Sequence, residues 1–255
     1  MKNLIILFFG PPGSGKTTYS QFLIDSYLSL NRKVIYVNLD CLNTNFFKKN
    51  SIDFKDILNG QEIMSELHIG SNSSIILSID YLQNNLEWLE IEMNSWNNLK
   101  KQNYFFFDFP GQIELYTHHG GIKNLIQKLN KNTFTLSSLI LSDAFYWYDK
   151  TNYHMLALSN LMVIFNTEIP FFHILTKTDL IKNYNTICKN YKETTIFITK
   201  AKLKDIFSWS NKLNFSLDNI ILDFGMINPT PINLTKTSHL LDLIKHLEKF
   251  IQYSK

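Results

Sequence analysis

A glycine-rich stretch near the start of the chain is followed directly by a lysine and a threonine. From Gly10 to Thr17 it has the sequence GPPGSGKT, which fits the Walker A pattern. Backbone N–H groups of such a loop cradle phosphates, the lysine reaches the β- and γ-phosphates, and the threonine hydroxyl suits Mg²⁺. The stretch therefore predicts a nucleoside-triphosphate site. The residues expected to contact the nucleotide here are Gly13, Ser14, Gly15, Lys16, Thr17 and Thr18.

A second acidic position lies at the end of a phenylalanine-rich run. Asp108 closes this apolar run in the manner of a Walker B strand, so we expect it to bind the metal together with Thr17. The residues that follow allow hydrolytic chemistry. Gly111 can bring a backbone N–H close to the γ-phosphate, and Gln112 can orient a water, as a glutamine does in signalling GTPases. Glu114 could hold that water or accept its proton.

A third carboxylate, Asp40, follows another strand-like run at 34–38. The carboxyl ends of parallel strands meet at one edge of a sheet, where open α/β sheets bind their ligands. We therefore expect Asp40 in the metal shell or positioning the attacking water. A structural aspartate in a turn is the alternative.

A later strand-like run ends in a motif suited to reading a base. It comprises Thr176, Lys177, Thr178 and Asp179. The Asp179 carboxylate can accept hydrogen bonds from the N1–H and the exocyclic amine of guanine, while the Lys177 stem packs over the ring. Adenine has no donor at N1, so the carboxylate would stay unpaired against it. The motif predicts a preference for guanine.

Alternating strand-like and helical segments predict how these residues are positioned. Such alternation indicates βαβ units and a mainly parallel central sheet flanked by helices, with right-handed crossovers. We find no linker or internal repeat, so residues 1–255 are expected to form a single domain. Residues 183–224 show mixed patterning, and a final helix is expected near 238–253. The strand-like runs are 4–9, 34–38, 104–108, 136–141, 171–176 and, more weakly, 227–233.

Composition excludes several classes of function. The chain has 255 residues, 45% of them hydrophobic, which indicates a globular protein with a sizeable core. A net charge of +3 does not indicate nucleic-acid binding or a membrane surface, and no apolar run reaches the ~18–20 residues that span a bilayer. Only two cysteines are present, which excludes a disulfide framework and fits a reducing compartment. Arg32 is the single arginine, so mechanisms that need several guanidinium groups on phosphates are excluded.

Together these motifs resemble one family, the GPN-loop GTPases, and among its paralogues most of all GPN-loop GTPase 2. The resemblance implies a P-loop GTPase domain with inserted helices that binds GTP or GDP with Mg²⁺. It also implies a homodimer, or a heterodimer with a paralogous GPN-loop GTPase. Eukaryotic members are implicated in RNA polymerase II assembly and nuclear import, so a cytoplasmic protein that shuttles to the nucleus is expected. The matching stretches are 10–19, 37–40, 80–89, 107–119, 175–180 and 231–233.

The chain departs from the family pattern at the triplet that gives the family its name. Gly-Pro-Asn is replaced by Gly70, Ser71 and Asn72, and Cys41 replaces the proline that normally follows the aspartate. In the family the asparagine reaches across the dimer toward the partner's phosphate site, so the resemblance assigns Asn72 a catalytic role. Loss of the proline removes a fixed φ from this loop, which bears on dimer geometry and hydrolysis rate.

Three functional hypotheses follow. The first is a GTP-hydrolysing dimeric switch, without an arginine finger in cis, because Arg32 is expected as a solvated charge at the end of the first helix. The second is a P-loop kinase that phosphorylates a nucleotide or an RNA end. The third is a non-hydrolysing, GTP-bound subunit of a heterodimer, suggested by Ser71 and Cys41. The resemblance implies RNA polymerase II subunits as clients and no direct contact with nucleic acid or membrane.

Overall fold

The structure is a computed structural model in which seven strands form one sheet. It describes residues 3–43, 50–96, 102–112, 114–117, 120–131, 134–147, 150–181, 209–224, 229–234 and 237–253. The strands are β1 (Leu4–Phe9), β2 (Lys33–Asn38), β3 (Ser51–Asp53), β4 (Asn103–Asp108), β5 (Thr135–Asp143), β6 (Phe171–Thr176) and β7 (Thr230–Pro231). The order is β3-β2-β4-β1-β5-β6-β7, and every neighbouring pair is parallel. The prediction of a mainly parallel sheet is confirmed.

Helices and short 3-10 turns connect the strands. The helices are α1 (Lys16–Ser29), α2 (Gly60–Leu67), α3 (Ser71–Asn84), α4 (Leu86–Ser95), α5 (Glu114–Thr117), α6 (Gly121–Lys131), α7 (Lys150–Thr167), α9 (Trp209–Asp223) and α10 (Thr237–Tyr253). The 3-10 turns are Phe54–Asp56, Ala144–Trp147 and Thr178–Leu180. Within the ranges just given, every helix is too short or too polar to cross a bilayer.

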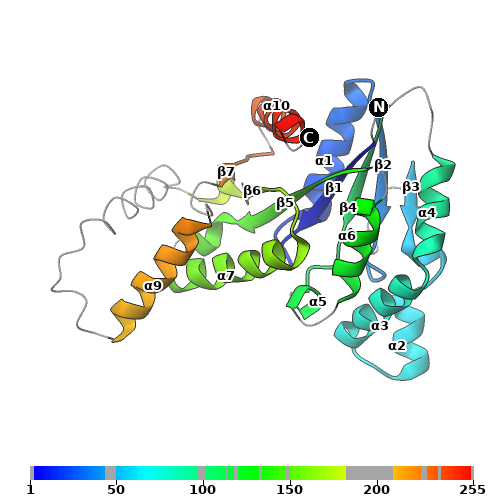
Figure 1. Ribbon diagram of the computed structural model, residues 1–255, viewed down its shortest axis with the longest axis horizontal. Helices are drawn as coiled ribbons and strands as arrows, with labels where there is room; N and C mark the ends of the chain where they lie inside the picture. Colours follow the sequence, from blue (N-terminus) through cyan, green and yellow to red (C-terminus); the bar gives the residue numbers. More distant parts are fainter. Residues whose placement is uncertain are drawn as a thin grey trace.

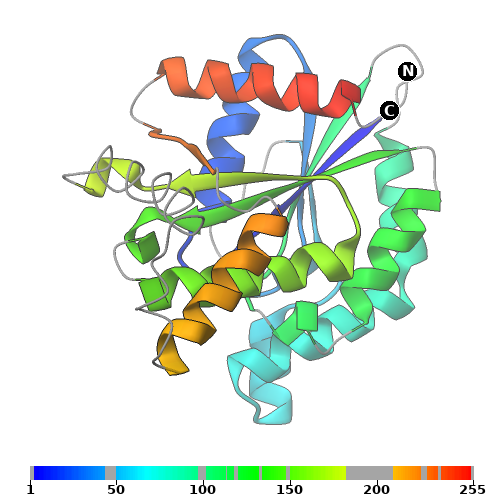
Figure 2. The same cartoon turned by 60° about the vertical axis from the view of Figure 1, so that its left-hand side comes forward.

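The sheet is covered on both faces, which explains its apolar strands. Figures 1 and 2 show α1 and α10 together on one face, and α3, α6 and α7 on the other. On the first face, Leu23 of α1, Leu247 of α10 and Phe106 of β4 belong to one buried core. On the second face, Ile79 of α3 and Leu125 of α6 belong to a separate core. A parallel strand between two helical layers has no wet side, so β1 and β4 are buried along their whole length.

Strand order also explains where the site forms. The chain passes from β1 to β2 and β3, returns to β4 between β1 and β2, and then continues on the other side of β1. The carboxyl end of β1 is therefore a topological switch point, where the flanking connections leave in opposite directions and open a crevice. The glycine-rich loop occupies this position, between β1 and α1.

Two sequence expectations change in the structure. The three-residue strand β3, which pairs with the outer edge of β2, was not predicted, because so short a strand has little periodicity of its own. The weak run at 227–233 contributes only Thr230–Pro231 as a strand, while residues 225–228 lie outside the described part of the chain. Of the segment with mixed patterning at 183–224, residues 183–208 lie outside the described part as well, and α9 follows.

Arg32 is not the solvated helix-end charge that was expected. Its guanidinium donates to the Tyr104 hydroxyl at 2.6 Å and forms an ion pair with Glu248 of α10. It also lies over the rings of Tyr27 and Tyr104, with its Cζ 5.6 and 5.5 Å from the ring centroids. Arg32 is remote from the phosphate loop, as expected. It follows the C-terminal end of α1, whereas Lys16 begins that helix, and the helix length separates them by about 20 Å.

Candidate nucleotide-binding site

The glycine-rich loop folds around a buried lysine. Gly15 precedes α1 with φ 91°, a left-handed conformation that side chains rarely adopt, and Gly13 has φ 73°. The Lys16 ammonium donates to the carbonyls of Gly10 at 3.0 Å and Pro11 at 3.1 Å. Burial lowers the pKa of Lys16, while the negative charges of two nearby aspartates oppose that shift. The ammonium is thus held inside a loop whose N–H groups can receive phosphates.

Asp108 and Thr17, the two residues predicted to bind the metal together, are in direct contact. The Thr17 hydroxyl, at the start of α1, donates to Oδ2 of Asp108 at 2.7 Å. The Tyr36 hydroxyl of β2 donates to the same oxygen, also at 2.7 Å. Burial and the Asp108 charge raise the pKa of Tyr36 far above its ordinary value, so this hydroxyl stays protonated and donates. Burial raises the pKa of Asp108 as well, while the hydrogen bonds from Tyr36 and Thr17 and the Lys16 charge counteract it.

The free face of Asp108 fits Mg²⁺. Its Oδ1 is buried and has no hydrogen-bond partner among the described residues. Within the same residues no group of three or more His, Cys, Asp and Glu side chains could form a metal cage. Mg²⁺ is commonly bound by one or two carboxylates plus waters and substrate phosphates, which matches a site of Thr17 and Asp108.

Asp40 lies in the same electrostatic cluster, and its hydrogen bonds join it to Asn38 and Leu42 in its own turn. Its Oδ1 accepts the Leu42 N–H at 3.0 Å. Burial raises the pKa of Asp40, while the Leu42 N–H and the Lys16 charge lower it. Three residues after Asp40, the Asn43 side-chain amide donates to the Thr17 hydroxyl at 3.5 Å. A role for Asp40 in the metal shell or with the attacking water stays a prediction.

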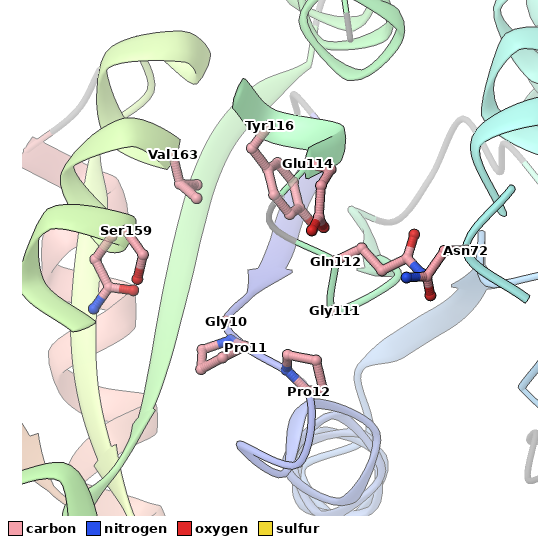
Figure 3. Close-up of a pocket in the computed structure, with 11 residues that line it drawn as sticks. Gly10, Pro11, Pro12, Asn72, Gly111, Gln112, Glu114, Tyr116, Ser159 and Val163 are labelled. Atoms are coloured by element: carbon pink, nitrogen blue, oxygen red, sulfur yellow. The ribbon is translucent and has the colours of Figure 1, made fainter. Parts of the chain in front are cut away.

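Gly111 and Gln112 approach the phosphate loop from the end of β4. A Cβ on Gly111 would lie 2.7 Å from the Lys16 Nζ and 3.0 Å from the Pro12 backbone, so only glycine fits there without displacement. The Gln112 amide donates to the Asn72 Oδ1 of the same chain, at the start of α3 (Figure 3). Asn72 thus contacts its own chain's glutamine in this structure.

A cavity of about 330 Å³ opens between these segments. Figure 3 shows Gln112 and Asn72 on one side of it, Pro11 and Pro12 below, and the α7 residues opposite. Exposed Glu114, in the first turn of α5, lines it as well. The residues lining the cavity are Gly10, Pro11, Pro12, Asn72, Gly111, Gln112, Glu114, Tyr116, Ser159, Asn160 and Val163. Gln112 thus lies at the edge of this cavity.

The base-reading motif is fastened to the phosphate loop. The Thr176 hydroxyl donates to the Ser14 carbonyl at 2.9 Å and lies 3.1 Å from the Ser142 carbonyl. Lys177 follows with φ 56°, and Asp179 is exposed in the next turn. These contacts fix the distance between the two predicted parts of the site. Thr18 is exposed on α1.

Two further polar residues contact the predicted site residues, and the sequence reasoning did not find them. Tyr36 lies inside an apolar strand, and nothing in its pattern separates it from a core residue. Asp143 does carry a signal: it ends β5 as Asp108 ends β4. Its Oδ2 pairs with the Lys177 ammonium at 2.8 Å. The rule that selected Asp108 would therefore have selected Asp143.

The fold and the site together define a class. A glycine-rich loop at the switch point of a parallel sheet, with a buried lysine and a threonine bonded to the acid of a neighbouring strand, is that of a P-loop nucleoside-triphosphate-binding protein. The profile of a family described as "Conserved hypothetical ATP binding protein" matches residues 8–253. GPN-loop GTPase 2 of Danio rerio is 33% identical over 248 residues, covering 94% of this chain and 78% of the relative. The chain belongs to the GPN-loop GTPase family.

A second relative agrees with this assignment, and a solved structure shares the fold. GPN-loop GTPase 3 of Kluyveromyces lactis is 29% identical, covering 100% of this chain and 94% of the relative. The crystal structure of PAB0955, described as a GTPase in apo form from Pyrococcus abyssi, superposes with a TM-score of 0.77 at 24% identity and covers 97% of both chains. That likeness shows the same fold.

Proposed function

We propose that this protein binds GTP with Mg²⁺ and hydrolyses it as a dimeric GPN-loop switch. The observation that carries the proposal is the contact between Thr17 and Asp108 beside the buried Lys16, with Gly111 held against the lysine ammonium. A phosphate chain cradled by the loop would bring its terminal group between Lys16 and Gln112. These are the positions from which a P-loop GTPase stabilises charge and orients water.

Each residue has a step in this scheme. The loop N–H groups and Lys16 bind the β- and γ-phosphates, and the Gly111 N–H adds a donor to the γ-phosphate. Thr17 and Asp108 would hold Mg²⁺, which would supply neutralisation of the charge that develops on the phosphate oxygens. Gln112 orients the attacking water, and Glu114 accepts its proton. Because Arg32 is engaged about 20 Å away, no guanidinium of this chain takes part.

Guanine selectivity is assigned to Asp179. It is exposed, and the lysine two residues before it is held by the end of β5, so the carboxylate is accessible to a base lying against the Lys177 stem. The matching family profile is described as ATP-binding, so the choice of base needs a direct measurement. Asp179→Asn should relax the preference for GTP over ATP. Unchanged selectivity would remove Asp179 from the base site.

The main test compares phosphate release from GTP and from ATP by the purified protein with Mg²⁺. Release from GTP supports the proposal. Tight GTP binding without release favours the non-hydrolysing subunit, and a paralogue that restores turnover would support that reading. Preference for ATP, with labelled phosphate appearing on an added nucleotide or RNA end, would instead support the kinase.

The dimer is proposed from the family resemblance, and Asn72 allows it to be tested. Family members present this asparagine to the partner subunit, whereas in this structure it meets the Gln112 of its own chain. Mixing Asn72→Ala protein with Gln112→Ala protein separates the two arrangements. If Asn72 acts across the dimer, the mixture regains one intact site per heterodimer and turnover returns. If Asn72 acts within its own chain, no site is complete and the mixture stays inactive.

The cellular role is proposed from the same resemblance. We infer a cytoplasmic protein that shuttles to the nucleus and assists assembly of RNA polymerase II, without contacting nucleic acid or membrane itself. Co-purification of polymerase subunits with the wild-type protein, and their loss with a Lys16→Ala variant, is the expected result. Equal recovery with both proteins would contradict a nucleotide-dependent role.

A further inference from the structure

Two neighbouring strand ends beside the proposed base site carry opposite charges. Asp143 is the last residue of β5, and it lies opposite Thr176 of β6 in the strand register. Lys177 is the next residue, and its Nζ lies 2.8 Å from Oδ2 of Asp143. The Asp143 side chain is 17% exposed, and that of Lys177 is 38% exposed. The aspartate is therefore the more enclosed member of the pair.

Both ends of this ion pair are fixed by backbone structure. The other carboxylate oxygen of Asp143 accepts the Phe145 N–H at 2.9 Å, which holds the carboxylate in its own turn. At the other end, Lys177 has left-handed backbone geometry, and its carbonyl accepts the Leu180 N–H at 3.1 Å. The preceding Thr176 is bonded to the phosphate loop. The mobile part is the four-carbon stem of Lys177, and Asp143 holds its far end.

A fixed stem matters if it serves as a surface for a base. A free lysine side chain populates many rotamers, and binding a flat ring against its methylene groups would remove that freedom. A stem that is already extended between two fixed points loses less on binding, so affinity rises without a new contact to the ligand.

We propose that Asp143 is a positioning residue for guanine recognition: it holds the Lys177 stem across the face of the base, while Asp179 reads the edge. This rests on the proposed function, because it takes guanine to bind at Thr176–Asp179. The competing explanation is an ion pair that only stabilises the two strand ends.

Diphosphates test this without interference from hydrolysis. The dissociation constants of GDP, IDP and ADP are measured with Mg²⁺ for wild type, Asp143→Asn and Asp179→Asn. Asp25→Asn, on the exposed surface of α1, is the control with the same charge change. The asparagine at position 143 keeps an oxygen for the Phe145 N–H but turns a neutral amide toward Lys177. IDP lacks the exocyclic amine and so reports on the base edge.

The expected pattern separates face from edge. Asp143→Asn weakens GDP and IDP equally, by about tenfold, which corresponds to loss of one charge-assisted interaction. Asp179→Asn weakens GDP more than IDP, and Asp25→Asn changes neither. Asp143→Glu keeps a carboxylate, so it should bring the GDP affinity back to within about threefold of wild type, given that one charge-assisted bond is restored.

Several results would overturn the assignment. One is an Asp143→Asn variant that binds GDP as tightly as Asp25→Asn does, and another is a loss of affinity for GDP but not for IDP. Either outcome removes Asp143 from support of the ring face. If Asp143→Asn lowers the thermal stability and Asp143→Glu does not restore the GDP affinity, the ion pair only stabilises the two strand ends. Wild-type protein that binds ADP as tightly as GDP would refute the guanine site itself, and this inference with it. If wild-type protein prefers GDP over ADP and Asp143→Asn leaves the GDP affinity unchanged, the role of Asp143 is refuted while the guanine site stands.

Discussion

Tyr36→Phe isolates the hydrogen bond that supports the proposed metal carboxylate. The Tyr36 hydroxyl lies 2.7 Å from Oδ2 of Asp108 in a core where Tyr36 is 1% exposed. A hydrogen bond to a charged group contributes about 1.5–3 kcal/mol. Because Thr17 still donates to the same oxygen, the lower end applies, and we expect a loss of about 1.5 kcal/mol. At about 2–4 °C per kcal/mol for a chain of this size, Tm should fall by about 3–6 °C.

Tyr27→Phe is a control drawn from the same core. Tyr27 is fully buried against the same sheet face, yet within the described residues its hydroxyl has no hydrogen-bond partner. Removing an unpaired buried hydroxyl relieves a desolvation cost, so this variant should be neutral or slightly more stable. The two variants delete the same atom from the same residue type, which makes their difference a measure of the Asp108 contact.

The assay combines urea unfolding of both variants with the Mg²⁺ dependence of GTP turnover. Without the Tyr36 hydroxyl, the ionised form of Asp108 loses a hydrogen-bond donor. The pKa of that carboxyl therefore rises further, and metal binding weakens. We expect the half-saturating Mg²⁺ concentration to rise about tenfold for Tyr36→Phe only. Equal unfolding free energies for the two variants would refute the reasoning about the hydrogen bond. A destabilised Tyr36→Phe with unchanged Mg²⁺ dependence would refute the link to the metal.

Three further predictions concern Lys16, Gly111 and Cys41. Lys16→Ala should weaken GTP binding at least about a hundredfold in equilibrium titration, because it removes a buried ammonium from the phosphate loop; tight binding by this variant would contradict the loop assignment. Gly111→Ala should lower kcat/KM about tenfold or more, since its Cβ would press on Lys16. Gly120→Ala, with its nearest atom at 3.8 Å, should leave kcat/KM unchanged. Cys41 is fully buried, and burial raises the pKa of its thiol. Alkylation of this thiol, followed by peptide mass spectrometry, should therefore proceed about a hundredfold more slowly in the native than in the unfolded protein. Rapid alkylation of the native protein would show that this part of the core opens.

Sequence predicts this sheet well because its central strands are buried on both faces. Continuous apolar runs bounded by polar residues gave β1 and β6 with the bounds that the structure has. The Walker A spacing is local, so the loop at 10–17 could be found from eight residues. Strand β3 could not be found, because three residues pair only through the register that β2 offers.

The parts of the site that escaped prediction depend on distance through space. Tyr36 donates to Asp108 from 72 positions away, and no local pattern marks a tyrosine whose hydroxyl has a partner. Arg32 illustrates the same limit. A charge after a helix is normally solvated, but here α10 returns Glu248 to it from the far end of the chain. Pairings of this kind are set by the tertiary packing of surfaces.

The contacts of Arg32 with Tyr104 and Glu248 make this protein convenient for chemical labelling. Reagents selective for guanidinium groups normally label many positions, but this sequence offers one target. That target lies where Tyr104 at the start of β4 meets Glu248 of α10, and the phosphate loop is at the other end of α1. The labelling rate therefore reports whether the last helix is docked, and it does so without touching the nucleotide site. Release of α10 can be followed by mass spectrometry in a lysate, with no engineered tag or dye.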